Sequence, residues 1–127
     1  KFVMTIIQAA NKHTPEILFD SSERKMSFIG ISAPVNALEL YQHVMTWLNA
    51  NEQSLQGRMS FAFRLEYFNS ASMKAILMIL RWIKVRMDNE GNDWKIEWLV
   101  EEDDDFMLDA ADSYQQILET PFSIIQT

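Results

Sequence analysis

Two kinds of hydrophobic periodicity divide this chain into strands and helices. From Met59 to Tyr67 apolar side chains occupy every second position, so these alternate residues are expected to share one buried strand face. From Met73 to Met87 apolar side chains instead recur every three or four positions, as in an amphipathic helix. The same two patterns predict further strands at 15–20, 25–31 and 94–100, and further helices at 35–49 and 105–118.

These elements follow the order β-β-α-β-α-β-α, with optional short strands at both ends. Strand–helix–strand connections of this length favour parallel neighbours. The strands around Phe63 and Trp98 carry charge on one face, which indicates a sheet with one partly wet side. We therefore predict an α/β fold in a single domain. Its mixed β-sheet has about four to five strands, with helices mainly on one face. Residues 1–13 are expected to form an N-terminal arm or short strand before the domain at 14–127.

Composition narrows the possible functions of this domain. The 127 residues suit one domain, and a formal net charge of −7 with scattered basic residues argues against nucleic-acid binding. The longest wholly apolar run, 75–80, is far shorter than the ~20 residues that cross a bilayer, so no membrane insertion is expected. The absence of cysteine excludes disulfides and thiol chemistry and suits a cytoplasmic protein.

No set of residues indicates catalysis, so we expect no enzyme and no cofactor. The two histidines, His13 and His43, are better interpreted as surface or boundary residues than as bases or metal ligands. Three glycines at scattered positions cannot form a glycine-rich phosphate loop.

The acidic run Glu101–Asp105 and the tryptophans leave an alternative open. Five carboxylates could hold a hard cation, but they directly precede a predicted helix, where negative charge and an aspartate cap are stabilising. Trp47 and Trp82 lie at helix-face boundaries, where exposure would mark a binding surface. The alternative function is therefore a small-molecule-binding or scaffolding domain that uses exposed aromatics and the 101–105 run.

The segment Asn69–Ser72 joins the clearest strand to the longest helix. Asparagine and serine are preferred N-cap residues, so helix capping alone explains at least one of them. A hydroxyl here also lies beside the free N–H groups of the first helical turn, where an added phosphate would be tolerated. The pattern alone is compatible with both roles.

Four segments of the chain resemble the SiaC family of regulatory phosphoproteins. They are TPEILFD, MSFIGISAPVNALELYQHVMTWLNA, FRLEYFNSASMKAILMIL and WKIEWLVEEDDDFMLDAADSYQQILETPFSI. The resemblance extends from Thr14 to Ile124. Its most specific part is YFNSASMK at 67–74, which is similar to the family pattern Y-[FL]-N-[TS]-S-S-x-[KR].

The resemblance implies a fold related to STAS, or anti-sigma-factor antagonist, domains and a non-enzymatic role in bacterial partner switching. In such a switch a Ser/Thr protein kinase phosphorylates the domain and a PP2C-type phosphatase reverses the modification. The unmodified form binds an effector. For the SiaC family that effector is a diguanylate cyclase, which connects the switch to cyclic-di-GMP and biofilm formation.

The same resemblance assigns residues to these roles. The family's phosphoacceptor follows the motif asparagine, which places it on Ser70. The implied partner-binding residues are Asn69, Ser72, Ser32, Pro34 and Asn36. Two positions depart from the family pattern. Ala71 replaces a hydroxyl and so removes a competing acceptor, and Val35 replaces a glutamate after Pro34, which is expected to alter partner choice.

Overall fold

The computed structural model describes residues 3–127. Its strands are β1 (Met4–Gln8), β2 (Glu16–Asp20), β3 (Lys25–Ser32), β4 (Arg58–Phe68), β5 (Asp93–Val100) and β6 (Ser123–Gln126). Its helices are α1 (Ala37–Ala50), α2 (Glu52–Leu55), α3 (Ser70–Met87) and α4 (Asp105–Leu118). None of the helices in the described chain has the length and hydropathy needed to span a lipid bilayer.

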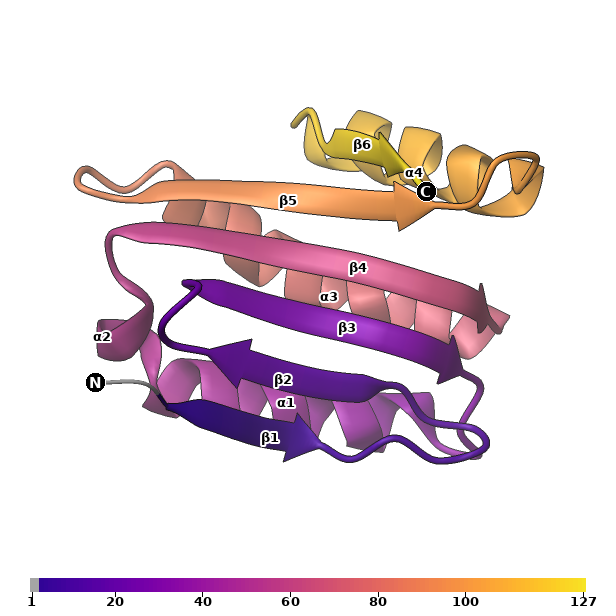
Figure 1. Cartoon of the computed structure of the whole chain (residues 1–127), viewed down its shortest axis with the longest axis horizontal. Helices are drawn as coiled ribbons and strands as arrows, with labels where there is room; N and C mark the ends of the chain where they lie inside the picture. The colour runs from indigo at the N-terminus through magenta and orange to yellow at the C-terminus, as the bar shows by residue number, and fades with distance from the viewer. Residues whose placement is uncertain (1–2) are drawn as a thin grey trace.

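Within the described residues, one mixed sheet of six strands runs in the order β1-β2-β3-β4-β5-β6. The first two pairings are antiparallel, and those of β3 with β4, β4 with β5 and β5 with β6 are parallel. Helices α1, α3 and α4 lie behind the sheet in Figure 1, so the prediction of one covered face is confirmed. The estimate of four to five strands was too low, because β1 and β6 both join the edges of the sheet.

The core lies between the sheet and its helices. Alternate residues of the central strands point into it, and a row of aromatic rings crosses three neighbouring strands. The ring centroids of Phe28 and Phe63 are 4.3 Å apart, and those of Phe63 and Trp98 are 5.6 Å apart. All three side chains are almost completely buried, so they account for much of the apolar area removed from water.

A β-bulge near the end of β4 corrects one prediction about this core. Gly30 of β3 pairs with Leu65, but the next residue of β3 pairs with Tyr67, so Glu66 is an extra residue on β4. The extra residue shifts the alternation by one position. Tyr67, which was expected to face the core, is 49% exposed, and Phe68 is buried in its place. Gly30 has a φ of +118°, a conformation that a side chain would strain.

Helix α1 begins at Ala37, slightly later than the predicted start at residue 35. Asn36 Oδ1 accepts a hydrogen bond from the backbone N–H of Glu39 at 3.1 Å, so Asn36 is the N-cap of this helix. Leu38, in the first turn of the helix, is exposed although it is apolar. The polar linker after α1 also contains the unexpected helix α2, whose Leu55 is fully buried.

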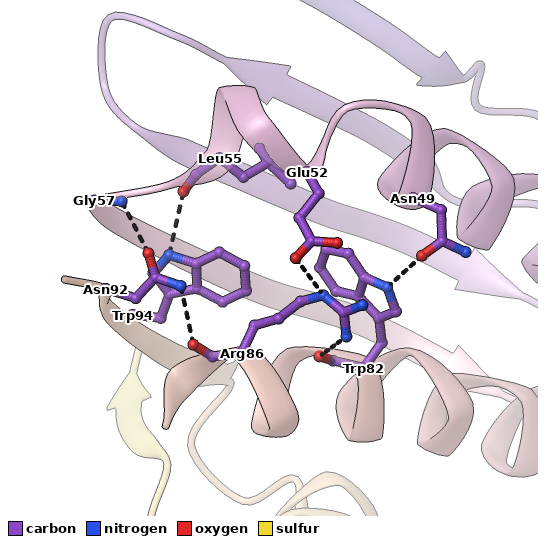
Figure 2. Close-up of polar contacts among 8 residues, drawn as sticks. All are labelled: Asn49, Glu52, Leu55, Gly57, Trp82, Arg86, Asn92 and Trp94. Carbon is purple, nitrogen blue, oxygen red and sulfur yellow. Dashed lines mark hydrogen bonds and ion pairs between the residues drawn. The ribbon is translucent and has the colours of Figure 1, made fainter. Parts of the chain in front are cut away.

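Polar contacts fix α2 between α1 and the end of α3 (Figure 2). Arg86 Nε lies 3.1 Å from Glu52 Oε2 as an ion pair without hydrogen-bond alignment, and its guanidinium lies 4.0 Å from the ring centroid of Trp82. The indole N–H groups donate to neighbouring elements, Trp82 to Asn49 Oδ1 at 2.8 Å and Trp94 to the Leu55 carbonyl at 3.2 Å. These contacts stabilise the end of the sheet where β4 and β5 begin.

Candidate functional site

The carboxyl ends of β3 and β4 bring two motif segments together. Ser32, the last residue of β3, pairs with Phe68 of β4, and the backbone N–H of Asn69 donates to the Ser32 carbonyl at 3.1 Å. Both strands end at the right of Figure 1, and each is followed by a helix that lies behind the sheet. The segment around Pro34 and the start of α3 therefore lie at the same end of the sheet.

Asn69 and Ser70 divide the roles at the start of α3. Asn69 is the N-cap, and its Oδ1 accepts a hydrogen bond from the backbone N–H of Ser72 at 2.8 Å. The cap therefore does not need the hydroxyl of Ser70. That side chain is exposed, and its hydroxyl forms no hydrogen bond with any residue that the structure describes. The hydroxyl oxygen of Ser70, the first residue of the helix, is thus accessible from solvent.

Ser72 and Ser32 are in the opposite situation, because both are fully buried. Ser32 Oγ donates to Ser72 Oγ at 2.9 Å, and it lies 2.7 Å from the hydroxyl of Tyr41 on α1. Since Ser32 has one proton to donate, Tyr41 is the donor to Ser32. Both were expected to contact a partner, and that expectation stays a prediction. In this structure their side chains hold the starts of two helices together.

Burial also sets the chemistry of the tyrosine in this cluster. Loss of solvent raises the pKa of Tyr41 to about 12. Tyr41 therefore remains a neutral donor at any physiological pH. In the sequence, Tyr41 recurs with Val44 and Leu48 at the spacing of a buried helix stripe. A tyrosine at a buried position needs a hydrogen-bond partner for its hydroxyl, and this need could have indicated the polar cluster from the sequence.

The segment before α1 places its residues at the surface near this cluster. Asn36 is exposed and caps the helix, and Pro34 is half-buried. Both line an open cavity of ≈ 470 Å³ together with His43. Val35 is completely exposed, so an apolar side chain stands where the family pattern has a carboxylate.

Two aromatic residues of α4 complete the surroundings of the α3 start, and sequence reasoning assigned no role to either. The Tyr114 hydroxyl donates to the Met73 carbonyl at 2.6 Å, which ties α4 to the first turn of α3. Burial raises the pKa of Tyr114, so it too stays protonated. Phe106 stacks on Tyr67, with 6.2 Å between ring centroids, and it is 47% exposed.

The acidic run begins α4 rather than forming a cation site. Asp104 is the N-cap of α4, and its Oδ1 accepts from the backbone N–H of Met107 at 3.1 Å, which confirms the capping interpretation. Among the described residues, no group of three or more acidic or histidine side chains is arranged to hold a metal ion. Trp82, which was considered as a surface residue, is buried.

Comparison with known proteins identifies the family. Residues 8–127 match the profile of the SiaC family regulatory phosphoprotein. The chain belongs to the SiaC family. An uncharacterized protein of Pseudomonas aeruginosa is 26% identical to this chain over 111 residues, and the match covers 87% of each protein.

Solved structures of SiaC proteins share this fold. The structure of SiaC of Pseudomonas aeruginosa has a TM-score of 0.80 at 20% identity, and the match covers 98% of this chain and 99% of that chain. A chain from the crystal structure of the diguanylate cyclase SiaD in complex with its activator SiaC, also from Pseudomonas aeruginosa, has a TM-score of 0.80. That chain is 24% identical, and the match covers 93% of this chain and 96% of that chain. The arrangement of strands and helices described above is therefore that of SiaC structures.

Proposed function

We propose that this SiaC-family chain is a non-enzymatic, phosphorylation-controlled switch protein with Ser70 as its phosphoacceptor. A Ser/Thr protein kinase adds the phosphate and a PP2C-type phosphatase removes it. The unmodified form binds and controls a diguanylate cyclase, and so connects the switch to cyclic-di-GMP signalling. A relationship to STAS domains, which the resemblance implies, stays a prediction.

The contrast between the two hydroxyls of the motif is the observation that carries this proposal. Ser70 is exposed, and its oxygen forms no hydrogen bond with the described residues. Ser72 is fully buried, and its oxygen accepts from Ser32. A kinase must bring the acceptor oxygen to the γ-phosphate of its nucleotide, which an exposed side chain permits and a buried one does not. Ala71 between them offers no oxygen.

The position of Ser70 also explains how a phosphate would act without unfolding the domain. The positive end of the α3 dipole and its first free N–H groups favour negative charge at this residue. The phosphate would add nearly two negative charges to the surface on which the effector docks, and so would change the electrostatic interaction between the two proteins. We propose that Val35, Pro34 and Asn36 belong to the same contact surface, and that the exposed Val35 alters the choice of cyclase.

Phosphopeptide mapping of the protein purified from its native host tests the assignment of Ser70. We expect the phosphate on Ser70 in one growth state, and its removal by a PP2C-type phosphatase. Ser70→Ala should abolish phosphorylation by the kinase. Ser113→Ala, which changes an exposed serine of α4, is the matched control and should leave it intact. Phosphate on another residue, with Ser70 unmodified under every condition, would remove the basis of the switch.

No observation favours the alternative of a small-molecule-binding domain. Trp82, Trp94 and Trp98 are buried, and each indole N–H donates to a protein oxygen. The acidic run starts α4. These three tryptophans therefore pack the core instead of lining a ligand cavity.

A further inference from the structure

An apolar groove runs between α3 and α4 on the outer surface of the helices. It encloses a cavity of ≈ 280 Å³. Met73 and Leu77 line it from α3, and Phe106 and Ile117 line it from α4. Phe106 and Ile117 are 47% and 49% exposed, so a contiguous apolar surface faces solvent. Contiguous exposed apolar surface on a small domain is a common mark of a binding site.

The groove begins one helical turn from Ser70. Met73, Lys74 and Leu77 follow Ser70 at spacings of three, four and seven residues, which places all four on one face of α3. Met73, Lys74 and Leu77 all line the groove. Any chain seated in the groove would therefore extend toward the proposed phosphoacceptor.

The two walls of the groove carry opposite charge. On α4, Asp105, Asp109 and Asp112 are exposed at successive spacings of four and three, and this helix contains no lysine or arginine. On α3, the exposed Lys74 lies at the edge of the groove and forms no ion pair within residues 3–127. A partner that complements both walls needs basic side chains toward α4 and a carboxylate toward Lys74.

We propose that this groove binds an amphipathic helix of the effector protein. The helix places an apolar stripe into the groove, lysine or arginine side chains along α4, and an acidic side chain against Lys74. The lining of α4 from Phe106 to Ile117 is about 16 Å long, the length of roughly three helical turns. Grooves between helices are a common site for such helices, which insert residues at spacings of three and four.

The nature of the groove favours a helix over an extended peptide. The groove walls are helices, whose backbone groups are already hydrogen-bonded to one another. An extended peptide would leave its own N–H and C=O groups without partners against an apolar surface, and this is unfavourable. A helix satisfies its backbone internally.

This proposal rests on the proposed function in one respect, the effect of the phosphate. A phosphate on Ser70 would be four residues from Lys74, the spacing at which opposite charges pair on a helix. Lys74 would then be neutralised by the phosphate, and the acidic side chain of the effector helix would face the phosphate instead. Binding would weaken because the attraction at this end becomes repulsion.

Binding of a designed helix tests the groove without the cyclase. The probe is a stapled peptide of about 14 residues with a leucine stripe, lysines on one side and glutamates on the other. Its control is the isomer with lysines and glutamates exchanged. We expect NMR shifts of the protein to centre on Met73, Leu77 and Ile117, and Kd to be at least about fivefold weaker for the isomer. No shifts at millimolar peptide, shifts centred elsewhere, or equal affinities would each overturn the proposal.

Groove variants carry the test to the diguanylate cyclase of the same host. Ile117→Glu changes an exposed groove residue, and Val85→Glu changes a residue of α3 that is 61% exposed and does not line the groove. We expect Ile117→Glu to weaken binding at least about tenfold and Val85→Glu to leave it within about twofold. Equal binding by the two variants would contradict the groove.

The two proposals fail in different ways. If phosphorylated Ser70 leaves peptide and cyclase affinity unchanged while Ile117→Glu still reduces both, the groove stands and the switch is wrong. If the phosphate abolishes cyclase binding while Ile117→Glu has no effect, the switch stands and the groove is wrong. A dimer of the chain that Ile117→Glu dissociates would show that a second copy fills the groove, and would also overturn the helix proposal.

Discussion

At the scale of single residues, burial separates the hydroxyls near the start of α3 into two kinds. Ser32, Ser72 and Tyr41 share a buried set of hydrogen bonds with oxygen–oxygen distances of 2.7 and 2.9 Å. Ser70 is exposed and takes no part in it. A free hydroxyl thus lies on a helix start that buried neighbours hold in place, so the surface at Ser70 can change charge while the fold beneath it is retained.

The raised pKa of Tyr41 predicts a pH dependence of stability. The unfolded chain releases this proton near pH 10, whereas the folded chain holds it until about pH 12, so the folded state binds more protons in this interval. The free energy of unfolding should therefore be unaffected by Tyr41 below pH 10 and should fall by up to about 2 kcal/mol as the pH rises to 12. Urea denaturation across this interval measures the slope.

Tyr41→Phe isolates this contribution. The variant should lose about 1 kcal/mol at neutral pH, because the hydrogen bond to Ser32 is gone. It should also show a shallower decline than the original protein between pH 10 and 12. Tyr67→Phe, at an exposed tyrosine, is the control and should keep the original slope. Parallel curves for Tyr41→Phe and the original protein would disprove the assigned role of burial.

At the scale of elements, the contacts of Arg86 hold α2 against α3 at the end of the sheet away from Ser70 (Figures 1 and 2). Arg86→Ala removes the ion pair with Glu52, the cation–π contact with Trp82 and a hydrogen bond to the Trp82 carbonyl. We expect the free energy of unfolding to fall by about 1 to 2 kcal/mol. Cyclase binding by the folded variant should be unchanged.

Arg81→Ala is the matched control, since Arg81 is an exposed arginine on the same helix and forms no ion pair within residues 3–127. Chemical denaturation of the two variants gives the comparison directly. Similar stability of both would show that the contacts in Figure 2 do not stabilise the fold.

Strands and helices with a long regular pattern could be predicted from the sequence, whereas irregular pairing and side-chain burial could not. Long periodic segments such as 59–67 and 105–118 were identified correctly as a strand and a helix because their pattern reflects one buried face. The inserted Glu66 leaves no mark in local periodicity, so the turn of Tyr67 toward solvent could be found only from the pairing with β3. Likewise, the family resemblance singled out Ser70 as the expected phosphoacceptor, but only the structure shows that Ser70 is exposed and that Ser72 is buried against Ser32.

At the scale of the whole molecule, the parallel strands β3 and β4 deliver both motif segments to one end of the sheet. There the segment with the exposed Val35 follows β3, the start of α3 follows β4, and the groove between α3 and α4 begins one helical turn further on. The opposite end carries the contacts that stabilise α2. We propose that this separation lets the regulatory surface change charge without a change in the stability of the domain.

The most direct test of the switch is the affinity of the diguanylate cyclase for two forms of this protein. One form is unmodified, and the other carries phosphoserine incorporated at position 70. Calorimetry should show that the phosphate weakens binding at least about tenfold, while the melting temperatures of the two forms stay close. Equal affinity of the cyclase for both forms would contradict the account.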